Sequence, residues 1–164
     1  KGPKRRKQQQ QQQRDCPCGG PRSYAECCGP FHEGAAAPTA NALLRARYSA
    51  LAKKLPGFVV KTTHPTNPQW RDDAEAWAAR IAKGLDRTRF TALRVVQELD
   101  LDDKTTEIAF ECDMQPLSQR GQGAKAIVVT ERATFVREDG VWYYQGGRDI
   151  NAETTKGVAS PHQR

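Results

Sequence analysis

The chain has 164 residues and a net charge of +7, with 26 lysines and arginines against 19 acidic residues. This length allows one domain with a real core plus a small appendage, and it excludes two large domains. No apolar run reaches the roughly 18 residues of a membrane-spanning helix, and no short apolar stretch follows the basic start as in a secretory signal. We therefore expect a protein with no membrane span.

The first 14 residues form a basic, glutamine-rich arm. They hold six of the cations and no acid, so the rest of the chain is almost neutral. The arm has no apolar side chains with which to join a core, and we expect it to bind an anionic partner through phosphate contacts. An acidic protein and an anionic membrane surface are alternatives. Its cations are Lys1, Lys4, Arg5, Arg6, Lys7 and Arg14.

Four of the five cysteines are close together, as Cys16-Pro-Cys18 and then Cys27-Cys28. Disulfides fit poorly, because Cys16 and Cys18 are too close to bridge comfortably and a vicinal Cys27–Cys28 bond strains its peptide. Four thiolates at about 2.3 Å around one tetrahedral Zn²⁺ fit better. We expect one structural zinc ion, since four cysteines leave no ligand position for water. Free or redox-paired thiols are the alternative.

The next segments have helical periodicity. Thr39 is the expected N-cap of a helix that runs to about Leu55 and ends at Pro56-Gly57, and a shorter turn covers 58–61. A second helix is expected from Asn67, as cap, to Gly84. The inward stripe of the first helix is Leu44, Tyr48, Leu51 and Leu55, and that of the second is Trp70, Ala74, Trp77, Ala78 and Ile81.

From Arg89 the pattern alternates, which predicts four strands at about 89–99, 105–117, 125–138 and 141–146. Asp102-Asp103 and Asp139-Gly140 are turn signals between neighbouring strands. Helices followed by an antiparallel meander predict an α+β fold, with the helices covering one face of a curved four-stranded sheet.

The spacing Cys-x-Cys-x₈-Cys-Cys resembles the SEC-C zinc motif, and the chain from Asp15 to about Gly147 resembles the YchJ family. Members join a SEC-C motif to a domain resembling nuclear transport factor 2 (NTF2), which implies a zinc knuckle followed by a cone-shaped domain. Some members carry a second C-terminal motif, but no cysteine follows Cys112 here. The residues that carry the family resemblance are 16–30, 35–40, 45–50, 63–65 and 135–144.

We divide the chain into the arm (1–14), the SEC-C-type zinc knuckle and linker (15–37), the NTF2-like domain (38–150) and a C-terminal tail (151–164). The first residue is Lys1 rather than methionine, so we expect an upstream segment such as a cleaved organellar transit peptide. SEC-C motifs recur in plastid proteins. The resemblance therefore implies the plastid stroma ahead of the mitochondrial matrix or the cytosol.

Four residues of the domain are candidates for a pocket. Glu131 shares strand parity with inward apolar residues, so it needs a partner, and we expect a buried ion pair with Arg47. His64 precedes a proline and is expected to form local hydrogen bonds, while Cys112 is expected to be a small core residue. The sequence contains no phosphate loop, nucleotide fingerprint, catalytic triad or carboxylate metal cage. We expect no catalytic residues.

These observations favour a non-catalytic zinc-binding adaptor that docks onto a large, RNA-containing organellar assembly such as a ribosome. The alternative is a small-molecule binder or an enzyme that uses the cavity of the cone, with Glu131 and His64 at its mouth.

Overall fold

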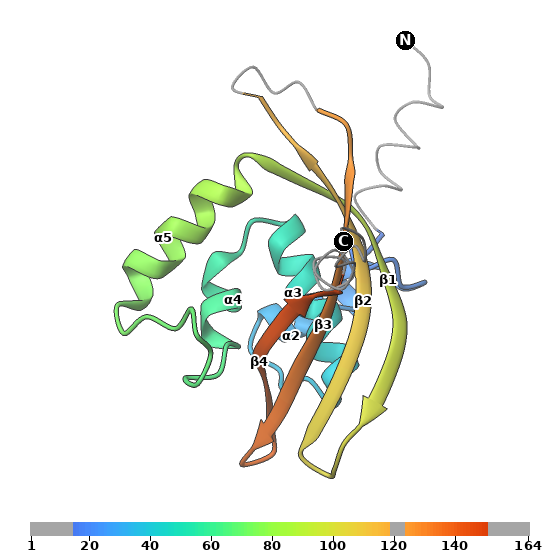
Figure 1. The fold of residues 1–164 in the computed structure, drawn as a ribbon, viewed down its shortest axis with the longest axis vertical. Helices are drawn as coiled ribbons and strands as arrows, with labels where there is room; N and C mark the ends of the chain where they lie inside the picture. Colours follow the sequence, from blue (N-terminus) through green and yellow to red (C-terminus); the bar gives the residue numbers. More distant parts are fainter. Residues whose placement is uncertain (1–14, 119–123, 151–164) are drawn as a thin grey trace, which may run out of the picture.

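A computed structural model describes residues 15–118 and 124–150. One four-stranded antiparallel sheet, in the order β1-β2-β3-β4, curves around the helices, which all lie on one side of it (Figure 1). The α+β architecture is the one expected. The helical elements are η1 (Tyr24–Glu26), α2 (Gly29–His32), α3 (Ala40–Ala52), α4 (Pro56–Lys61) and α5 (Ala74–Leu85), and the strands are β1 (Thr88–Asp100), β2 (Thr105–Pro116), β3 (Ile127–Glu138) and β4 (Val141–Asp149).

Helix α3 is the central helix of the domain. The Thr39 hydroxyl accepts a hydrogen bond from the amide of Ala42 at 3.0 Å, which confirms the expected cap. The helix ends at Ala52, three residues earlier than expected, and Pro56 begins α4 rather than only ending α3. A proline costs nothing at a first helical position, where its missing N–H would have no partner in the helix.

Helix α5 starts later than the sequence predicts. Asn67 accepts a hydrogen bond from the amide of Gln69 at 2.8 Å, but it closes a local turn and caps no helix. The N-cap is Asp73, whose carboxylate accepts from Ala76 at 2.9 Å. Trp70 thus lies outside the helix, although its ring packs on Trp77 with 5.5 Å between centroids.

The strands agree with the alternating pattern to within three residues at each end. The β3–β4 hairpin turns at Asp139 and Gly140, with φ angles of 48° and 80°. Two successive residues with positive φ are typical of a tight turn that matches strand twist. The buried side chains of β2 and β3 that face α3 include Ile108, Ala133 and Phe135, each 0 % exposed.

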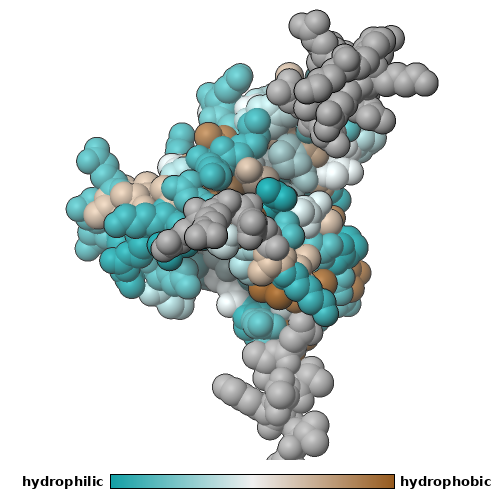
Figure 2. Space-filling model, turned by 90° about the horizontal axis from the view of Figure 1, so that it is seen from above, coloured by the Kyte–Doolittle hydropathy of each residue, from teal (hydrophilic) through white to brown (hydrophobic). Residues whose placement is uncertain are grey.

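The described surface is mainly hydrophilic, with hydrophobic side chains in small separate groups on the face that Figure 2 shows. On the sheet face away from the helices, arginines pair with acids across neighbouring strands. Arg94 lies 3.0 Å from Glu111 and 2.6 Å from Asp113, and Arg132 lies 3.8 Å from Glu107. Within the described residues, no helix has the length and apolarity that a membrane crossing needs.

Candidate metal centre and the cavity of the domain

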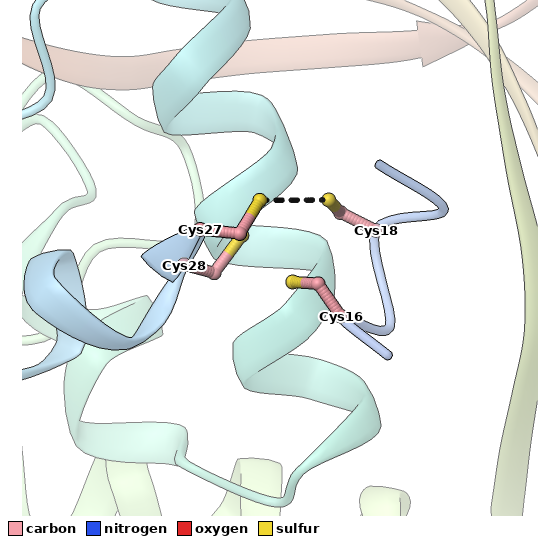
Figure 3. A group of neighbouring side chains, drawn as sticks. All are labelled: Cys16, Cys18, Cys27 and Cys28. Atoms are coloured by element: carbon pink, nitrogen blue, oxygen red, sulfur yellow. Dashed lines mark hydrogen bonds between the residues drawn. The ribbon is translucent and has the colours of Figure 1, made fainter. Parts of the chain in front are cut away.

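The four clustered cysteines point toward one another beside α3 (Figure 3). Their sulfur atoms all lie within 4.8 Å of one another, and the Cys18–Cys27 and Cys27–Cys28 sulfur pairs are 3.6 and 4.0 Å apart. Four sulfurs at 2.3 Å from a central tetrahedral ion would be separated by about 3.8 Å. The donor set and its spacing therefore fit one metal ion. No disulfide joins them.

The backbone between the cysteine pairs shapes this cluster. Gly19 has a φ of +77°, a conformation that residues with a Cβ rarely adopt. The turn that results lets the amide of Gly20 donate to the sulfur of Cys18 at 3.4 Å. Such an amide favours the thiolate, which is the form that binds metal.

The four thiols cannot all ionise easily when they are this close. A hydrogen bond with Cys28 lowers the pKa of Cys18 to about 4, while burial raises the pKa of Cys27 to about 11. The pKa of Cys28 is raised, first by the same hydrogen bond and then by burial. A divalent cation at the centre would offset the negative charge of all four thiolates.

The knuckle is attached to α3 by contacts that the sequence did not predict. The Nε2–H of His32 donates to the carbonyl of Ala46 at 2.8 Å, which leaves Nδ1 to accept from the Tyr24 hydroxyl at 2.7 Å. Arg45 donates to the carbonyl of Cys18 at 3.1 Å, and the sulfur of Cys16 lies 3.5 Å from the Ser49 hydroxyl. The knuckle is therefore part of the core and not a separate module.

Cys112 lies outside this cluster, as expected. It is 8 % exposed in the hydrophobic core, on β2, and it is not among the four cysteines that could share an ion. Burial raises the pKa of its thiol to about 11, so it is a poor nucleophile.

A cavity of about 380 Å³ lies between the helices and the sheet. Side chains from α3, α4, α5 and all four strands line it, mostly apolar or aromatic. Among them are Leu51, Trp77, Phe90, Met114, Val129 and Phe135. Its polar lining residues include Thr63, Asn67 and Gln69. Three others, Arg47, Glu131 and Tyr144, come from α3, β3 and β4 and are in contact through Tyr144, and hereafter they are called the polar triplet.

The expected Arg47–Glu131 ion pair is wrong, because Tyr144 comes between the two charges. The Tyr144 hydroxyl donates to Glu131 Oε1 at 2.8 Å, and the Arg47 guanidinium lies over the Tyr144 ring, 4.4 Å from its centroid. Arg47 Nη1 instead bonds Val59 O at 2.9 Å and the hydroxyls of Thr62 and Thr63 at 2.8 and 3.1 Å. The inward orientation predicted for Glu131 is confirmed, since it lines the cavity.

Gly147 makes room for the Glu131 carboxylate. A Cβ at Gly147 would lie 2.5 Å from Cδ and 2.8 Å from Cγ of Glu131, both far inside contact distance. Sequence reasoning missed this glycine and Tyr144. The available signal was the Gly146-Gly147 pair, two residues after Tyr144 in a strand, where glycine often marks the close approach of another group.

His64 is not at the mouth of the cavity, which corrects that part of the sequence expectation. It is 7 % exposed and does not line the cavity. It forms the predicted local bond, with Thr66, and a second bond with Glu138, which is 74 residues away in the sequence. Its Nε2 donates to Glu138 at 2.9 Å, and its Nδ1 accepts from the Thr66 amide at 3.2 Å. The six cations of the arm and the C-terminal tail lie outside the described residues.

The chain was compared with proteins of known structure. A SEC-C motif containing protein from Rhodopseudomonas palustris is 25% identical, with a TM-score of 0.67 over 82% of this chain and 98% of that one. Another SEC-C motif containing protein, from Psychrobacter arcticus, is 26% identical, with a TM-score of 0.62 over 79% of each chain. The architecture of knuckle and domain is thus similar to that of SEC-C proteins.

The sequence comparisons agree with the structural ones. A UPF0225 protein of Xanthomonas oryzae is 37% identical over 133 residues, which are 81% of this chain and 93% of the relative. Residues 39–147 match the family described as the middle NTF2-like domain of YchJ. With the cysteine cluster ahead of that domain, the chain belongs to the YchJ family, whose SEC-C and NTF2-like parts it combines.

Proposed function

We propose that the protein is a non-catalytic, zinc-binding accessory protein that docks onto a large anionic partner, such as an RNA-containing assembly. The observation that carries this proposal is the four-cysteine cluster, whose sulfurs lie within 4.8 Å of one another beside α3. Four sulfur ligands complete the shell of zinc, so the ion has a structural role.

The position of the cluster supports this role. Cys16, Cys18 and Cys28 are 4 %, 0 % and 1 % exposed, and they pack in one core cluster with Ala46 and Tyr48 of α3. Zinc would hold the start of the chain in a fixed place on the domain. The basic arm ends at Arg14, two residues before the first ligand, so its attachment point would be fixed as well.

The charge of the described body supports the arm as the docking element. On the outer sheet face, Arg94 and Arg132 are paired with acids and have little free charge to offer phosphates. The six cations of residues 1–14 hold nearly the whole excess of positive charge.

A salt titration of RNA binding tests the docking proposal. The probe is a single-stranded polyuridylate oligomer, and the proteins are the full chain, a chain lacking residues 1–14, and a chain with all six arm cations changed to glutamine. For six phosphate contacts, log K should fall with log salt with a slope of about −4 in the full chain, and the slope should be near zero in both variants. Equal slopes in all three proteins would overturn the role of the arm.

We also propose residence in an organelle, first the plastid stroma. The compared relatives come from bacteria, so this part rests on the cysteine motif alone. Fractionation of the source cells, with an antibody against the domain, tests it, and recovery of the protein in the cytosol would contradict it.

A further inference from the structure

We propose that the cavity between the helices and the sheet binds a neutral, mainly apolar ring compound that carries one hydroxyl or amide group, which the polar triplet recognises. This site is independent of the metal centre and of the arm.

The size and lining of the cavity indicate a small organic ligand. Its volume of about 380 Å³ is at the lower end of the range for ligand pockets, roughly 300–1,000 Å³. Aromatic and aliphatic side chains form most of its wall, which also includes Thr63, Asn67 and Gln69, and the polar triplet is grouped around Tyr144. A mainly apolar wall with a few polar groups is typical of a site that fixes the orientation of its ligand.

The polar triplet has unused hydrogen-bonding atoms. Glu131 accepts one hydrogen bond, at Oε1, and within the described part of the chain its Oε2 has no partner. Arg47 uses Nη1 for its three bonds, which leaves Nε and Nη2 without partners in the same residues. Both side chains are half-buried. Among the described residues, Trp142 Nε1 is the one fully buried side-chain nitrogen or oxygen without a hydrogen-bond partner, so neither Glu131 nor Arg47 has such an atom. The free atoms of Glu131 and Arg47 are therefore accessible and not sealed.

The two charged groups of the wall are not paired with each other. No nitrogen of Arg47 lies within 4.0 Å of a Glu131 oxygen, since the two form no ion pair. A hydroxyl group on a ligand is both a donor and an acceptor. It would donate to the carboxylate and accept from the guanidinium, and an amide could do the same with two atoms.

The electrostatics of the wall favour a neutral ligand over a charged one. The positive group lies over the face of the Tyr144 ring and the negative group accepts a hydrogen bond from its hydroxyl, so the wall carries one charge of each sign around one side chain. Burial raises the pKa of Glu131 and lowers the pKa of Arg47 to about 10, as expected for charged groups that have lost part of their hydration. An added charge on the ligand would be costly there.

Four probes with the same ring system test the proposal: naphthalene, 2-naphthol, 2-naphthylmethylammonium and 2-naphthalenesulfonate. Amide shifts of the isotope-labelled full chain in NMR titrations give the place and the strength of binding. We expect the shifts to lie in the elements that line the cavity, and 2-naphthol to bind about tenfold more tightly than naphthalene, as for a hydrogen bond to a charged group. The two charged probes should bind more weakly than 2-naphthol.

Glu131→Gln is the test variant and Glu111→Gln is its matched control, because Glu111 lies on the outer sheet face, paired with Arg94. Glu131→Gln should cut the preference for 2-naphthol to about twofold and leave naphthalene binding unchanged, while the control keeps the full preference. Leu51→Trp, which fills the cavity, should abolish binding of both probes. The proposal is overturned if the shifts lie elsewhere, if a charged probe binds best, or if Glu131→Gln keeps the full preference.

Discussion

The cysteine cluster and the cavity are built in opposite ways. The candidate metal centre would take its four ligands from 13 consecutive residues, and their order along the chain already indicates the chemistry. The cavity takes its polar triplet from α3, β3 and β4, with 96 residues between Arg47 and Tyr144 in the chain. The first site therefore depends on local turns, and the second depends on the whole fold.

The two sites nevertheless share α3. Ser49 and Arg45 of this helix contact the knuckle, whereas Arg47 and Tyr48 line the cavity. Changes at either site should affect the other through this helix, but the size of the effect should differ, because a metal ion would hold the first site, whereas hydrogen bonds and packing hold the second.

Cys18→Ser or Cys27→Ser should have the largest effect. Each removes one ligand from a complete shell, and loss of a structural metal is among the few changes that destabilise a protein by more than about 4 kcal/mol. Metal analysis and thermal unfolding measure both results. Cys112→Ser is the control and should keep the metal. If the Cys112→Ser variant loses the metal while the Cys27→Ser variant keeps the metal, the assignment of the ligands is wrong.

Arg47→Met should come next. It removes three hydrogen bonds from a cation and leaves the Glu131 carboxylate without a nearby positive charge, which we expect to cost about 3 kcal/mol. Denaturant unfolding measures this loss in the free energy of unfolding. Arg80→Met on the exposed face of α5 should change stability by less than about 0.5 kcal/mol. Equal effects of the two changes would show that the cavity network adds nothing to stability.

Gly147→Ala should destabilise the fold by about 1–3 kcal/mol, because its Cβ would overlap the Glu131 side chain. Gly146→Ala is a matched control on the same strand, since the nearest atom to its Cβ would be 3.9 Å away. In a Glu131→Ala background the cost of Gly147→Ala should fall, and a double-mutant cycle measures this coupling. Additive effects would contradict the close approach.

The pH dependence of Glu131→Gln should be the smallest effect. Burial raises the pKa of Glu131 in the folded protein, so the folded state binds this proton more tightly than the unfolded state. The stability that this gives is complete below the unfolded pKa of about 4.3 and is lost as the pH rises through the folded pKa. Relative to the wild type, the glutamine variant should therefore gain stability over that window. Thermal unfolding at several pH values measures the difference in stability between the variant and the wild type. A gain of the variant that grows toward acid pH would contradict the raised pKa of Glu131.

Much of the fold could be predicted from the sequence, because its signals are local. The Thr39 cap, the strand alternation and the Asp139-Gly140 turn each depend on a few neighbouring residues, and the structure has all three. The predicted start of α5 was wrong because it, too, was based on a local signal. Asn67 has a cap's side-chain chemistry, but it uses it in a turn, and only packing around Trp77 decides that the helix begins after Asp73.

The polar triplet could be predicted only in part. Strand parity showed that Glu131 points inward, and periodicity placed Arg47 near the same core. Neither pattern could show that Tyr144 separates them, because this depends on the β3–β4 register and on the space left by Gly147. The contacts of His32 with Ala46 and of Arg45 with Cys18, which attach the knuckle to α3, were missed because they join segments that no periodic pattern relates.

X-ray absorption at the zinc edge, on the full chain purified without added metal, tests the central claim most directly. The account predicts about one zinc per chain, with four sulfur neighbours at about 2.3 Å and no oxygen or nitrogen in the shell. A metal-free protein whose four cysteines are linked as disulfides, or a zinc with a mixed or open shell, would contradict it.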